Sequence, residues 1–425
     1  MTSFAIRNFG CRVNQAEAFA WADELQGSGL RLGSGWEESD YVLVNSCTLT
    51  RRADRDVKRF IRKVARTNPG ARMIVTGCYA ERARGDIEAL PGVWMVVGNG
   101  GKETLAAKIL EDVGIDKAAG ASPVPPETAA YRARAFVKIQ DGCDCRCAYC
   151  VIPSVRGGSS SAGEEDVLSR VRALAGRGYR EIVLSGIHLS SYGLDLAPRG
   201  SLLGLLRRVA DQDERVRTRL SSLDPRFTDG ALAEAFAAVP RVAPHFHLAL
   251  QSGSRKILKA MGRDSDPGAN AETIRRFRAA SPDAALGADI IVGFPGETDE
   301  DFEETRAWIA GSALTYVHLF PFSPREGTAA AAMTQVDEAV RNRRAAGLRE
   351  LSREKDLAFR KKFVGRDLDA IVIEKRTGGA ITLTANGIRV ALDECDVPRR
   401  EAITVRITSA DEGKTTGKAV WRGGS

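Results

Sequence analysis

The chain has 425 residues, of which 43% are hydrophobic and 28% charged, and 62 basic side chains outnumber 55 acidic ones for a formal charge of +7. This ordinary globular composition excludes a wholly disordered or collagen-like chain. No uncharged apolar run approaches the roughly 18 residues of a membrane span, and the start, MTSFAIRNFGCRVNQ, lacks the apolar core of a signal peptide. We therefore expect a cytoplasmic protein with no membrane partner, whose basic balance permits binding to nucleic acid.

The first 115 residues alternate strand-like and helix-like patterns. Apolar strands are predicted at Phe4–Asn8, Tyr41–Asn45, Met73–Thr76 and Val93–Val97, with helices near 14–27, 52–66 and 102–112. This alternation predicts a small α/β domain with a parallel sheet over residues 1–115. The Ala- and Pro-rich segment 116–134 has no periodicity and is predicted to be a linker.

Residues 135–364 continue with a longer series of strands and helices. Strands are predicted at 135–140, 181–185, 217–222, 245–250, 287–293 and 316–322, and helices at 164–177, 229–239, 269–280 and 299–310. Six strands with crossover helices predict a partial (β/α)6 barrel, whose chemistry would lie at the C-terminal ends of its strands. The stretch 335–363 is highly charged and has a helical period.

The last part of the chain, residues 365–425, changes to short alternating strands. These are predicted at Ala370–Glu374, Ile381–Thr384 and Ile403–Ile407, and Gly378-Gly379 and Asn386-Gly387 provide turns. We expect a small β-barrel here. The fold class is therefore α/β, with a parallel-sheet domain, a partial barrel and a terminal β-barrel.

The eight cysteines carry the strongest functional signal, since in the cytoplasm they are more suited to metal binding or catalysis than to disulfides. Cys143, Cys147 and Cys150 follow the strand Phe136–Gln140 with the spacing C-x-x-x-C-x-x-C. Three thiolates on so short a loop can hold three irons of a [4Fe–4S] cluster and leave the fourth iron open, as chelation of S-adenosylmethionine (SAM) requires. The alternative is a closed zinc site that also includes Cys145.

A second group of cysteines is dispersed along the first domain. Cys11, Cys47 and Cys78 each follow the C-terminal end of a predicted strand. Because these ends meet at one edge of a parallel sheet, the three thiols can converge on a second cluster. The alternative is three unrelated buried thiols. Cys395, alone in the last part, is expected to be a core residue.

Several motifs together resemble the methylthiotransferase family of radical-SAM enzymes. They are FGCRVNQAE, YVLVNSCTLT, VTGCYAE, QDGCDCRCAYCVIPSVRG, VLSGIHLSSYG, HFHLALQSGS, DIIVGFPGET and LFPFSPREGT. The terminal barrel resembles the TRAM domain, an RNA-binding module of that family. Within the family, GCRVNQ and NSCTLT are similar to the branch that acts on N6-threonylcarbamoyladenosine in tRNA.

The resemblance implies the cofactors and the reaction. Cys143, Cys147 and Cys150 would ligate the SAM-binding [4Fe–4S] cluster, and the first-domain trio would ligate an auxiliary [4Fe–4S] cluster. A methylthio group would be inserted at carbon 2 of adenosine 37 in the tRNA anticodon loop, with electrons from a flavodoxin-like or equivalent reducing system. An unactivated C–H bond has no acidic proton, so radical chemistry is required rather than acid–base catalysis.

Further candidate residues lie near strand ends and on one helix. Contacts to SAM are expected from Tyr149, Ser185, Gly186, Ser221, Gln251 and Gly293, although small residues at such positions also simply form loops. The basic segment 51–66 places Arg55, Arg59, Arg62 and Arg66 near one helix face, which favours either RNA binding or an ordinary solvated surface. His245 and His247 share a strand face, and we expect them to pack or form hydrogen bonds rather than bind metal.

Two alternatives to the threonylcarbamoyladenosine enzyme stay open from the sequence. One has the same chemistry but acts on isopentenyladenosine in tRNA or on a ribosomal protein. The other is a non-catalytic, metal-stabilised RNA-binding protein. The mode of RNA recognition expected for an anticodon loop is the reading of unstacked bases in pockets.

Overall fold

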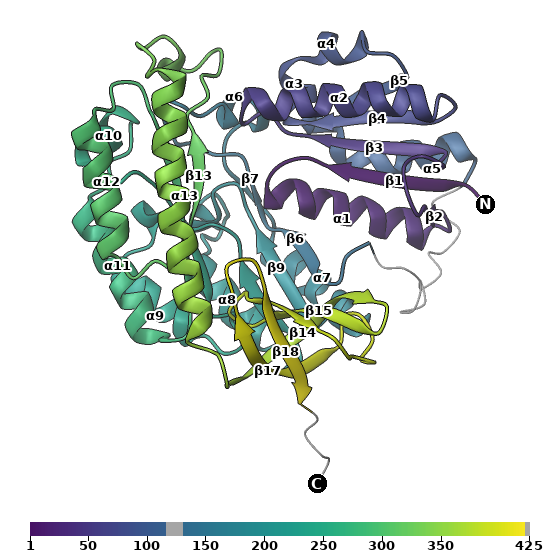
Figure 1. The fold of residues 1–425 in the computed structure, drawn as a ribbon. Coiled ribbons are helices and arrows are strands. Elements are labelled where there is room, and N and C mark those ends of the chain that lie inside the picture. The colour runs from purple at the N-terminus through teal and green to yellow at the C-terminus, as the bar shows by residue number, and fades with distance from the viewer. Residues whose placement is uncertain (116–130, 421–425) are drawn as a thin grey trace.

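The computed structural model describes residues 1–115 and 131–420, which form three successive parts (Figure 1). A central hollow opens between these parts. Most of the predicted linker, residues 116–130, lies outside the described residues. The predicted α/β architecture, with a parallel sheet, a partial barrel and a closed terminal barrel, is confirmed. Within the described residues, no helix is both long and apolar enough to cross a membrane.

The N-terminal part is a five-stranded parallel sheet in the order β2-β1-β3-β4-β5. Its strands are β1 (Ser3–Asn8), β2 (Arg31–Leu32), β3 (Tyr41–Ser46), β4 (Arg72–Gly77) and β5 (Val93–Val97). Its helices are α1 (Arg12–Gly27), α2 (Arg51–Thr67), α3 (Cys78–Arg82), α4 (Arg84–Glu88) and α5 (Leu105–Val113). All six residues of β3 are buried, as expected for a central parallel strand covered on both faces.

Successive residues of β3 pack on opposite faces of this sheet. Leu43 contacts the core formed with α1 and α5, while Val42 and Val44 contact the core formed with α2 and α3. On α2 only the apolar face is buried, through Val57, Ile61 and Val64, so its basic face is left to solvent. The helix begins at a Thr50 side chain that accepts a hydrogen bond from the Ala53 N–H.

The middle of the chain forms a partial barrel of parallel strands. They are β6 (Ala135–Lys138), β9 (Glu181–Ser185), β10 (Arg217–Leu220), β11 (His245–Gln251), β12 (Ala285–Val292) and β13 (Tyr316–Pro321). The outer helices are α7 (Glu164–Gly176), α8 (Leu202–Ala210), α9 (Gly230–Ala238), α10 (Arg255–Ala260), α11 (Pro267–Ala280) and α12 (Asp299–Gly311). The sheets β10-β9-β6 and β11-β12-β13 are joined by the parallel bridges Thr218–Val242 and Leu223–Leu248, which completes the predicted six-stranded arrangement.

The predicted strand 135–140 is divided in the structure. After β6, the short strand β7 (Gln140–Asp141) pairs antiparallel with β8 (Ser160–Ser161). This pairing closes the cysteine-containing loop at its base, and the loop ends in a short helix, α6 (Ile152–Arg156). The loop is therefore held at both ends directly above the barrel strands.

The C-terminal part is a closed barrel in the order β14-β15-β16-β18-β17. Its strands are β14 (Asp367–Arg376), β15 (Gly379–Thr384), β16 (Arg389–Leu392), β17 (Ala402–Ala410) and β18 (Thr415–Val420). The long charged helix α13 (Glu338–Lys361) precedes it and packs along β13. Cys395 is buried in the core of this barrel, as expected.

Buried arginines join the three parts. Arg325, 3% exposed, donates from Nη2 to Thr48 Oγ1 at 2.8 Å and to Asp54 Oδ2 at 2.6 Å, which links the barrel to the N-terminal part. Arg219 donates from Nη2 to the Ala385 carbonyl at 2.9 Å, which links the barrel to the C-terminal part. Because these contacts are buried, they fix the walls of the central hollow.

Candidate active site

The loop after β7 presents Cys143, Cys147 and Cys150 at the C-terminal ends of the barrel strands. All cysteines of the chain are free thiols, so no disulfide occupies these side chains. Backbone N–H groups donate to two of the sulfurs, from Cys145 to Cys143 Sγ at 3.4 Å and from Ile152 to Cys150 Sγ at 3.5 Å. Burial raises the pKa of Cys143 to about 12 and that of Cys150 to about 11, and these donors offset only part of the effect. The thiolate, which is the form that binds iron, therefore needs positive charge beside it.

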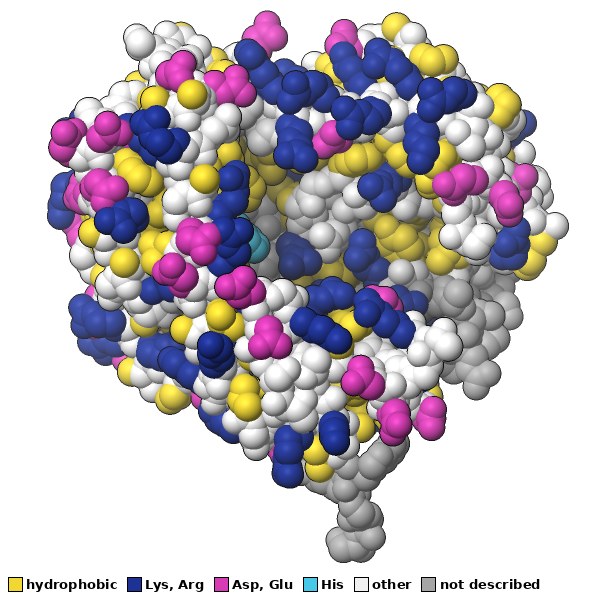
Figure 2. Space-filling model, in the orientation of Figure 1, with side chains coloured by type: hydrophobic (Ala, Val, Ile, Leu, Met, Phe, Trp, Pro, Cys, Tyr) yellow, Lys and Arg dark blue, Asp and Glu magenta, His cyan; other side chains and the backbone are white. Residues whose placement is uncertain are grey.

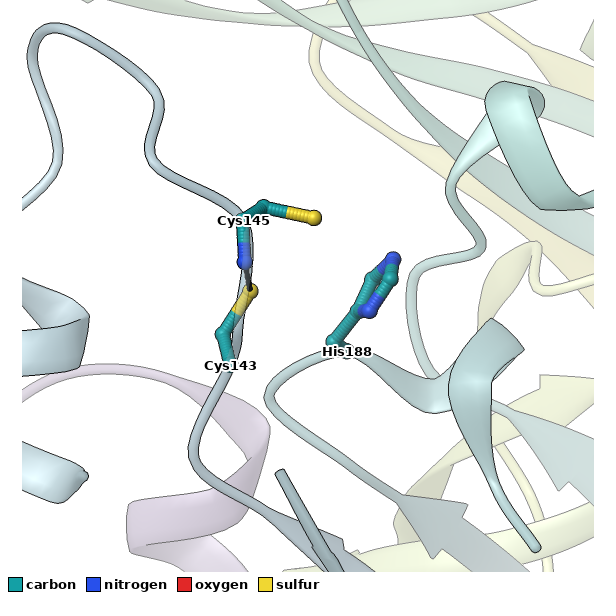
Figure 3. A group of neighbouring side chains, drawn as sticks. All are labelled: Cys143, Cys145 and His188. Carbon is teal, nitrogen blue, oxygen red and sulfur yellow. Dashed lines mark hydrogen bonds between the residues drawn. The ribbon is translucent and has the colours of Figure 1, made fainter. Parts of the chain in front are cut away.

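Cys145 points to a different neighbour from the other cysteines of this loop. Its sulfur faces His188, and ligand atoms of Cys143, Cys145 and His188 lie within 4.8 Å of one another (Figure 3). Arg226 Nη2 also donates to Cys145 Sγ at 3.3 Å. Cys145 thus lies at the loop's edge towards His188, whereas Cys143 and Cys150 pack with Cys78 from the N-terminal part.

A buried carboxylate supports the underside of the cysteine loop. Asp224 accepts from Arg226 Nη2 at 2.6 Å and from Arg263 Nη2 at 3.0 Å, and it lies 3.5 Å from His188 Nε2. Burial opposes ionisation, but hydrogen bonds from His188 and Arg226 and the charge of Arg263 hold the pKa of Asp224 well below its usual range. Arg226 is therefore fixed next to Cys145.

The second trio gathers at the carboxyl edge of the N-terminal sheet, as its position after three strands predicts. Cys11 caps α1, Cys47 follows β3 and Cys78 begins α3. Gly10 has φ +115°, and a Cβ there would lie only 2.9 Å from Cys47 Cβ, so glycine lets the Cys11 turn pack against Cys47. Burial raises the pKa of Cys47 to about 12, with smaller contributions from Cys11 and Cys78.

Arg156 lies between the two cysteine groups. It follows the loop of the first trio, and its Nε donates to Cys78 Sγ at 3.1 Å. Its Nη2 donates at 2.8 Å to Asn14 Oδ1, which also accepts from Cys11 Sγ at 3.4 Å. One side chain thus contacts Cys78 directly and Cys11 through Asn14.

The residues present fit two iron–sulfur clusters. Each site offers three free thiols from fixed loops, and each has N–H donors directed at sulfur. The raised thiol pKa of Cys47 means that its thiolate requires nearby positive charge, which iron would provide.

A cavity of about 900 Å³ opens between the three parts of the chain. Figure 2 shows it as a central hollow with basic side chains within and around it. Cys11 and Cys47 line one wall, the barrel residues Ser221 and His247 line another, and Asn386 of the terminal barrel lies at a third. The cavity therefore reaches the second cysteine trio from outside.

Histidines form part of the barrel wall of this cavity. Tyr316 Oη lies 2.9 Å from His245 Nε2 and 3.1 Å from His247 Nδ1, and His247 Nε2 lies 2.9 Å from Asp289 Oδ1. Ligand atoms of His247, Asp289 and His318 lie within 4.8 Å of one another. The hydrogen bonds and ring contacts account for the expected packing role of His245 and His247.

The residues expected to contact SAM fall into two groups. Ser185, Gly186 and Ser221 meet at the ends of β9 and β10, where the Gly186 N–H donates to Ser221 Oγ at 3.2 Å. Ser185 Oγ is buried without a hydrogen-bond partner among the described residues, so it has capacity for a ligand.

The second group lies at the ends of the next strands and on the loop. Gln251 ends β11 with a φ of +75°, and Gly293, with a φ of +71°, directly follows the end of β12. The Gly293 N–H is bound to Glu297 Oε1 at 2.9 Å, and a Cβ there would lie 2.1 Å from Arg341 Cγ, so packing already requires this glycine. Tyr149 packs beside Ile257 and Met261 in a small apolar cluster.

The four arginines of α2 expected to contact RNA are all exposed. They are Arg55, Arg59, Arg62 and Arg66. Within residues 1–115 and 131–420, none of them forms an ion pair. Leu49, Thr50 and Ala53, at the start of the same helix, line the cavity, and Figure 2 shows basic side chains along this part of the surface. The basic face of α2 therefore leads to the cavity mouth.

Sequence reasoning missed the arginines and carboxylates that support the cysteines. Arg156 lies six residues after Cys150, while Glu17 and Asp141, which pair with it, come from distant segments. Asp224 could have been predicted as a site residue. The run SSLDPRF places it just beyond the end of β10, where barrel residues commonly contact ligands.

The chain is similar to known proteins in sequence and in fold. The chain matches the Radical SAM superfamily over residues 137–309 and the Uncharacterized protein family UPF0004 over residues 3–98. It is 35% identical to the Threonylcarbamoyladenosine tRNA methylthiotransferase MtaB of Rickettsia prowazekii (strain Madrid E), over 92% of this chain and 91% of the relative. It is 34% identical to the tRNA-2-methylthio-N(6)-dimethylallyladenosine synthase of Parafrankia sp. (strain EAN1pec), over 88% and 78%. The fold is similar to radical S-adenosylmethionine methyltransferase TsrM from Kitasatospora setae, with a TM-score of 0.54 and 15% identity over 78% of this chain and 77% of that chain.

Proposed function

The chain belongs to the radical-SAM tRNA methylthiotransferases, and from this premise we propose that it inserts a methylthio group at carbon 2 of N6-threonylcarbamoyladenosine 37 in tRNA. The observation that carries the proposal is the meeting of two cysteine trios, one on a barrel loop and one on a sheet edge, across Arg156 and the packed side chains of Cys78, Cys143 and Cys150. The printed name of the Rickettsia relative and the GCRVNQ and NSCTLT motifs support the nucleoside.

We assign Cys143, Cys147 and Cys150 to the SAM-binding [4Fe–4S] cluster, and Cys11, Cys47 and Cys78 to the auxiliary cluster. When bound, SAM and the two clusters supply a radical able to break an unactivated C–H bond and the sulfur that replaces the hydrogen. The chain's own residues position these groups. Arg156 links the two sites, and the unpartnered Ser185 Oγ with Gly186 and Ser221 supports a SAM contact.

The same proposal divides the chain by task. Residues 1–115 would hold the auxiliary cluster, 135–364 would form the radical-SAM core, and 365–425 would act as a TRAM-like RNA-binding barrel. The cavity walls come from all three, so an anticodon-loop base that enters would lie against Cys11 and Cys47 of the auxiliary site and against Ser221 at the end of a barrel strand. The exposed arginines of α2 would contact the tRNA backbone, and a flavodoxin-like or equivalent protein in the cytoplasm would supply electrons.

A second candidate substrate is dimethylallyladenosine in tRNA, because the Parafrankia relative of 34% identity carries that name. Both candidates need the same clusters and the same attack at carbon 2. They differ only in the substituent at N6 of the adenine, which is anionic in the first and apolar in the second. The residues of the cavity, and not the cysteines, would therefore decide which of the two nucleosides is the substrate.

Alanine substitution of each cysteine trio tests the assignment of the clusters. Replacing Cys143, Cys147 and Cys150 should lower the iron content from about eight to about four per chain and abolish SAM cleavage. Replacing Cys11, Cys47 and Cys78 should remove a similar amount of iron, leave SAM cleavage and prevent methylthio insertion. Iron and sulfide assays with chromatography of the cleaved SAM measure these outcomes.

Cys395→Ala is the matched control, since this buried thiol lies in the terminal barrel. Its replacement should change neither the iron content nor SAM cleavage. Persistence of SAM cleavage without the first trio would show that the clusters have been assigned to the wrong cysteines. A single zinc ion in place of iron would instead support the non-catalytic RNA-binding alternative.

A further inference from the structure

Three arginines share one carboxylate at the barrel side of the cavity. Glu181, fully buried, accepts from Arg219 Nε at 2.8 Å and from Arg134 Nη1 at 3.3 Å, and Arg217 Nη1 lies 3.9 Å from it. Burial alone would raise the pKa of Glu181, but the three guanidinium groups lower it to about 2. The carboxylate is therefore ionised, and it neutralises only one of the three positive charges around it.

Arg12 adds a fourth positive charge to the cavity, from the N-terminal part of the chain. It directly follows Cys11, and its only polar partner among the described residues is Gln15 Oε1, at 3.1 Å. Arg12 is exposed and lines the same cavity as Arg219. Partial desolvation and the charge of Arg219 both lower the pKa of Arg12. No carboxylate among the described residues pairs with Arg12.

Arg219 is fixed in place but keeps donor capacity. Its side chain is 5% exposed, and its Nε and Nη2 are held by Glu181 and by the Ala385 carbonyl. Its Nη1 makes no hydrogen bond to any described residue, and Arg219 lines the cavity together with Arg12. A fixed guanidinium with a free N–H edge, in a cavity that a second, exposed guanidinium also lines, is suited to binding a carboxylate or phosphate.

We propose that Arg12 and Arg219 form an anion subsite that binds the carboxylate of the threonyl substituent on the substrate adenosine. The inference rests on the proposed function and names the residues that would select this nucleoside. The threonyl group is attached through its nitrogen, so its carboxylate stays free and negatively charged. Arg12 adjoins Cys11, so a base that presents carbon 2 to the auxiliary cluster brings its N6 substituent near this subsite.

The same charges disfavour the alternative substrate. A dimethylallyl group is apolar and would cover the guanidinium groups without pairing them, which is costly for buried charges. His245 is also uncharged there, because burial and the charges of Arg219, His247 and Arg12 hold its pKa well below its usual range. The excess positive charge therefore comes from the arginines, and selection against apolar substituents follows from it.

Binding of three anticodon stem-loop RNAs to the cluster-loaded enzyme tests the subsite. They differ only at nucleoside 37, which is N6-threonylcarbamoyladenosine, its methyl ester or adenosine. We expect the wild-type chain to bind the free acid about tenfold more tightly than the ester, as loss of a charge-assisted hydrogen bond predicts. Arg12→Gln should abolish this preference, and Arg12→Lys should retain part of it. Fluorescence anisotropy gives the dissociation constants.

Arg389→Gln is the matched control, because it removes one positive charge from a cavity residue whose side chain is 63% exposed. This variant should keep the tenfold preference for the free acid. An Arg12→Gln variant that weakens all three RNAs equally would overturn the subsite and indicate a contact to backbone phosphate. Retention of the full preference by Arg12→Gln would also overturn it.

The proposed function can fail independently of the subsite. If the wild-type chain methylthiolates the threonylcarbamoyl RNA while Arg12→Gln keeps its preference, only the subsite is wrong. If the wild-type chain modifies a dimethylallyladenosine RNA and not the threonylcarbamoyl RNA, both the proposed function and the subsite are wrong.

Discussion

Arg156 is the residue on which the two cysteine trios depend most directly. Its side chain is 1% exposed, and besides Cys78 it contacts Glu17 Oε1 at 3.0 Å and Asp141 Oδ1 at 2.8 Å. Glu17 also accepts from Lys102 Nζ at 2.6 Å. These side chains form a buried ionic cluster (Glu17, Lys102, Asp141 and Arg156) that couples α1 to the loop of the first trio.

Substitution of Glu17 by Gln should destabilise this part of the protein strongly. It would leave Lys102 and Arg156 buried with too little negative charge, and breaking one partner of a buried pair costs about 3–5 kcal/mol. Urea unfolding followed by fluorescence should show that the free energy of unfolding falls by about this amount. Glu111→Gln, at an exposed position on α5, should change stability by less than about 0.5 kcal/mol. A loss below about 1 kcal/mol for Glu17→Gln would contradict the role of the cluster.

The stability that the Glu17 carboxylate contributes should depend on pH in one direction. Burial raises the pKa of Glu17, but Lys102 and Arg156 outweigh it and lower the pKa from 4.5 to about 2. A carboxylate with a lowered pKa stabilises the folded state fully above its unfolded pKa. The difference between wild type and Glu17→Gln should therefore be largest above pH 4.5 and should shrink as the pH falls towards 2.

At the residue scale, the sequence predicted the cysteines but not their supporting charges. Spacing within one loop and position after three strands are local signals, so both trios could be recognised. Arg156 and Glu17 are 139 residues apart, and nothing local to either residue indicates the other. Such pairs are set by the packing of two domains.

At the scale of elements, α2 combines a structural face with a face available for binding. Val57, Ile61 and Val64 are buried, and the predicted arginine stripe is exposed on the opposite side. The helix starts at the cavity wall, where the Arg51 N–H donates to Ser323 Oγ of the barrel at 3.1 Å. A tRNA backbone along α2 would therefore lead its anticodon loop to the cavity.

Charge reversal of Arg55, Arg59 and Arg62 to Glu should weaken tRNA binding and flatten its salt dependence. Each lost phosphate contact should reduce the slope of log K against log salt by about 0.7–0.9. Anisotropy titrations at several salt concentrations measure this slope. The control Lys108→Glu lies on α5, which packs on the other face of the sheet, and should leave the slope unchanged. An unaltered slope in the triple variant would make the stripe an ordinary solvated surface.

Elements with strong periodicity were predicted well, and short elements were not. The predicted strand Val93–Val97 has the observed bounds of β5, because its apolar run is uninterrupted. The two-residue strands β2, β7 and β8 depend on pairing with neighbours and have no pattern of their own. Helix α8 was missed, although Ser201 caps it and its apolar residues follow a helical period.

At the scale of the whole molecule, the site exists because three parts of the chain meet. Arg325 contacts Asp54, 271 residues earlier, and Arg219 contacts the Ala385 carbonyl, 166 residues later. These buried contacts create a cavity with Cys11 and Cys47 on one wall and the barrel arginines Arg134 and Arg219 on another. The sequence predicted the fold of each part, but their arrangement follows from such long-range contacts and could not be predicted from it.

Nucleoside mass spectrometry of tRNA from a strain that lacks this chain tests the central claim most directly. We expect loss of methylthiolated threonylcarbamoyladenosine and accumulation of its unmethylthiolated parent, with recovery from wild-type protein and none from the Cys143→Ala variant. Unchanged levels of both nucleosides, or loss of the methylthiolated dimethylallyl nucleoside instead, would contradict it.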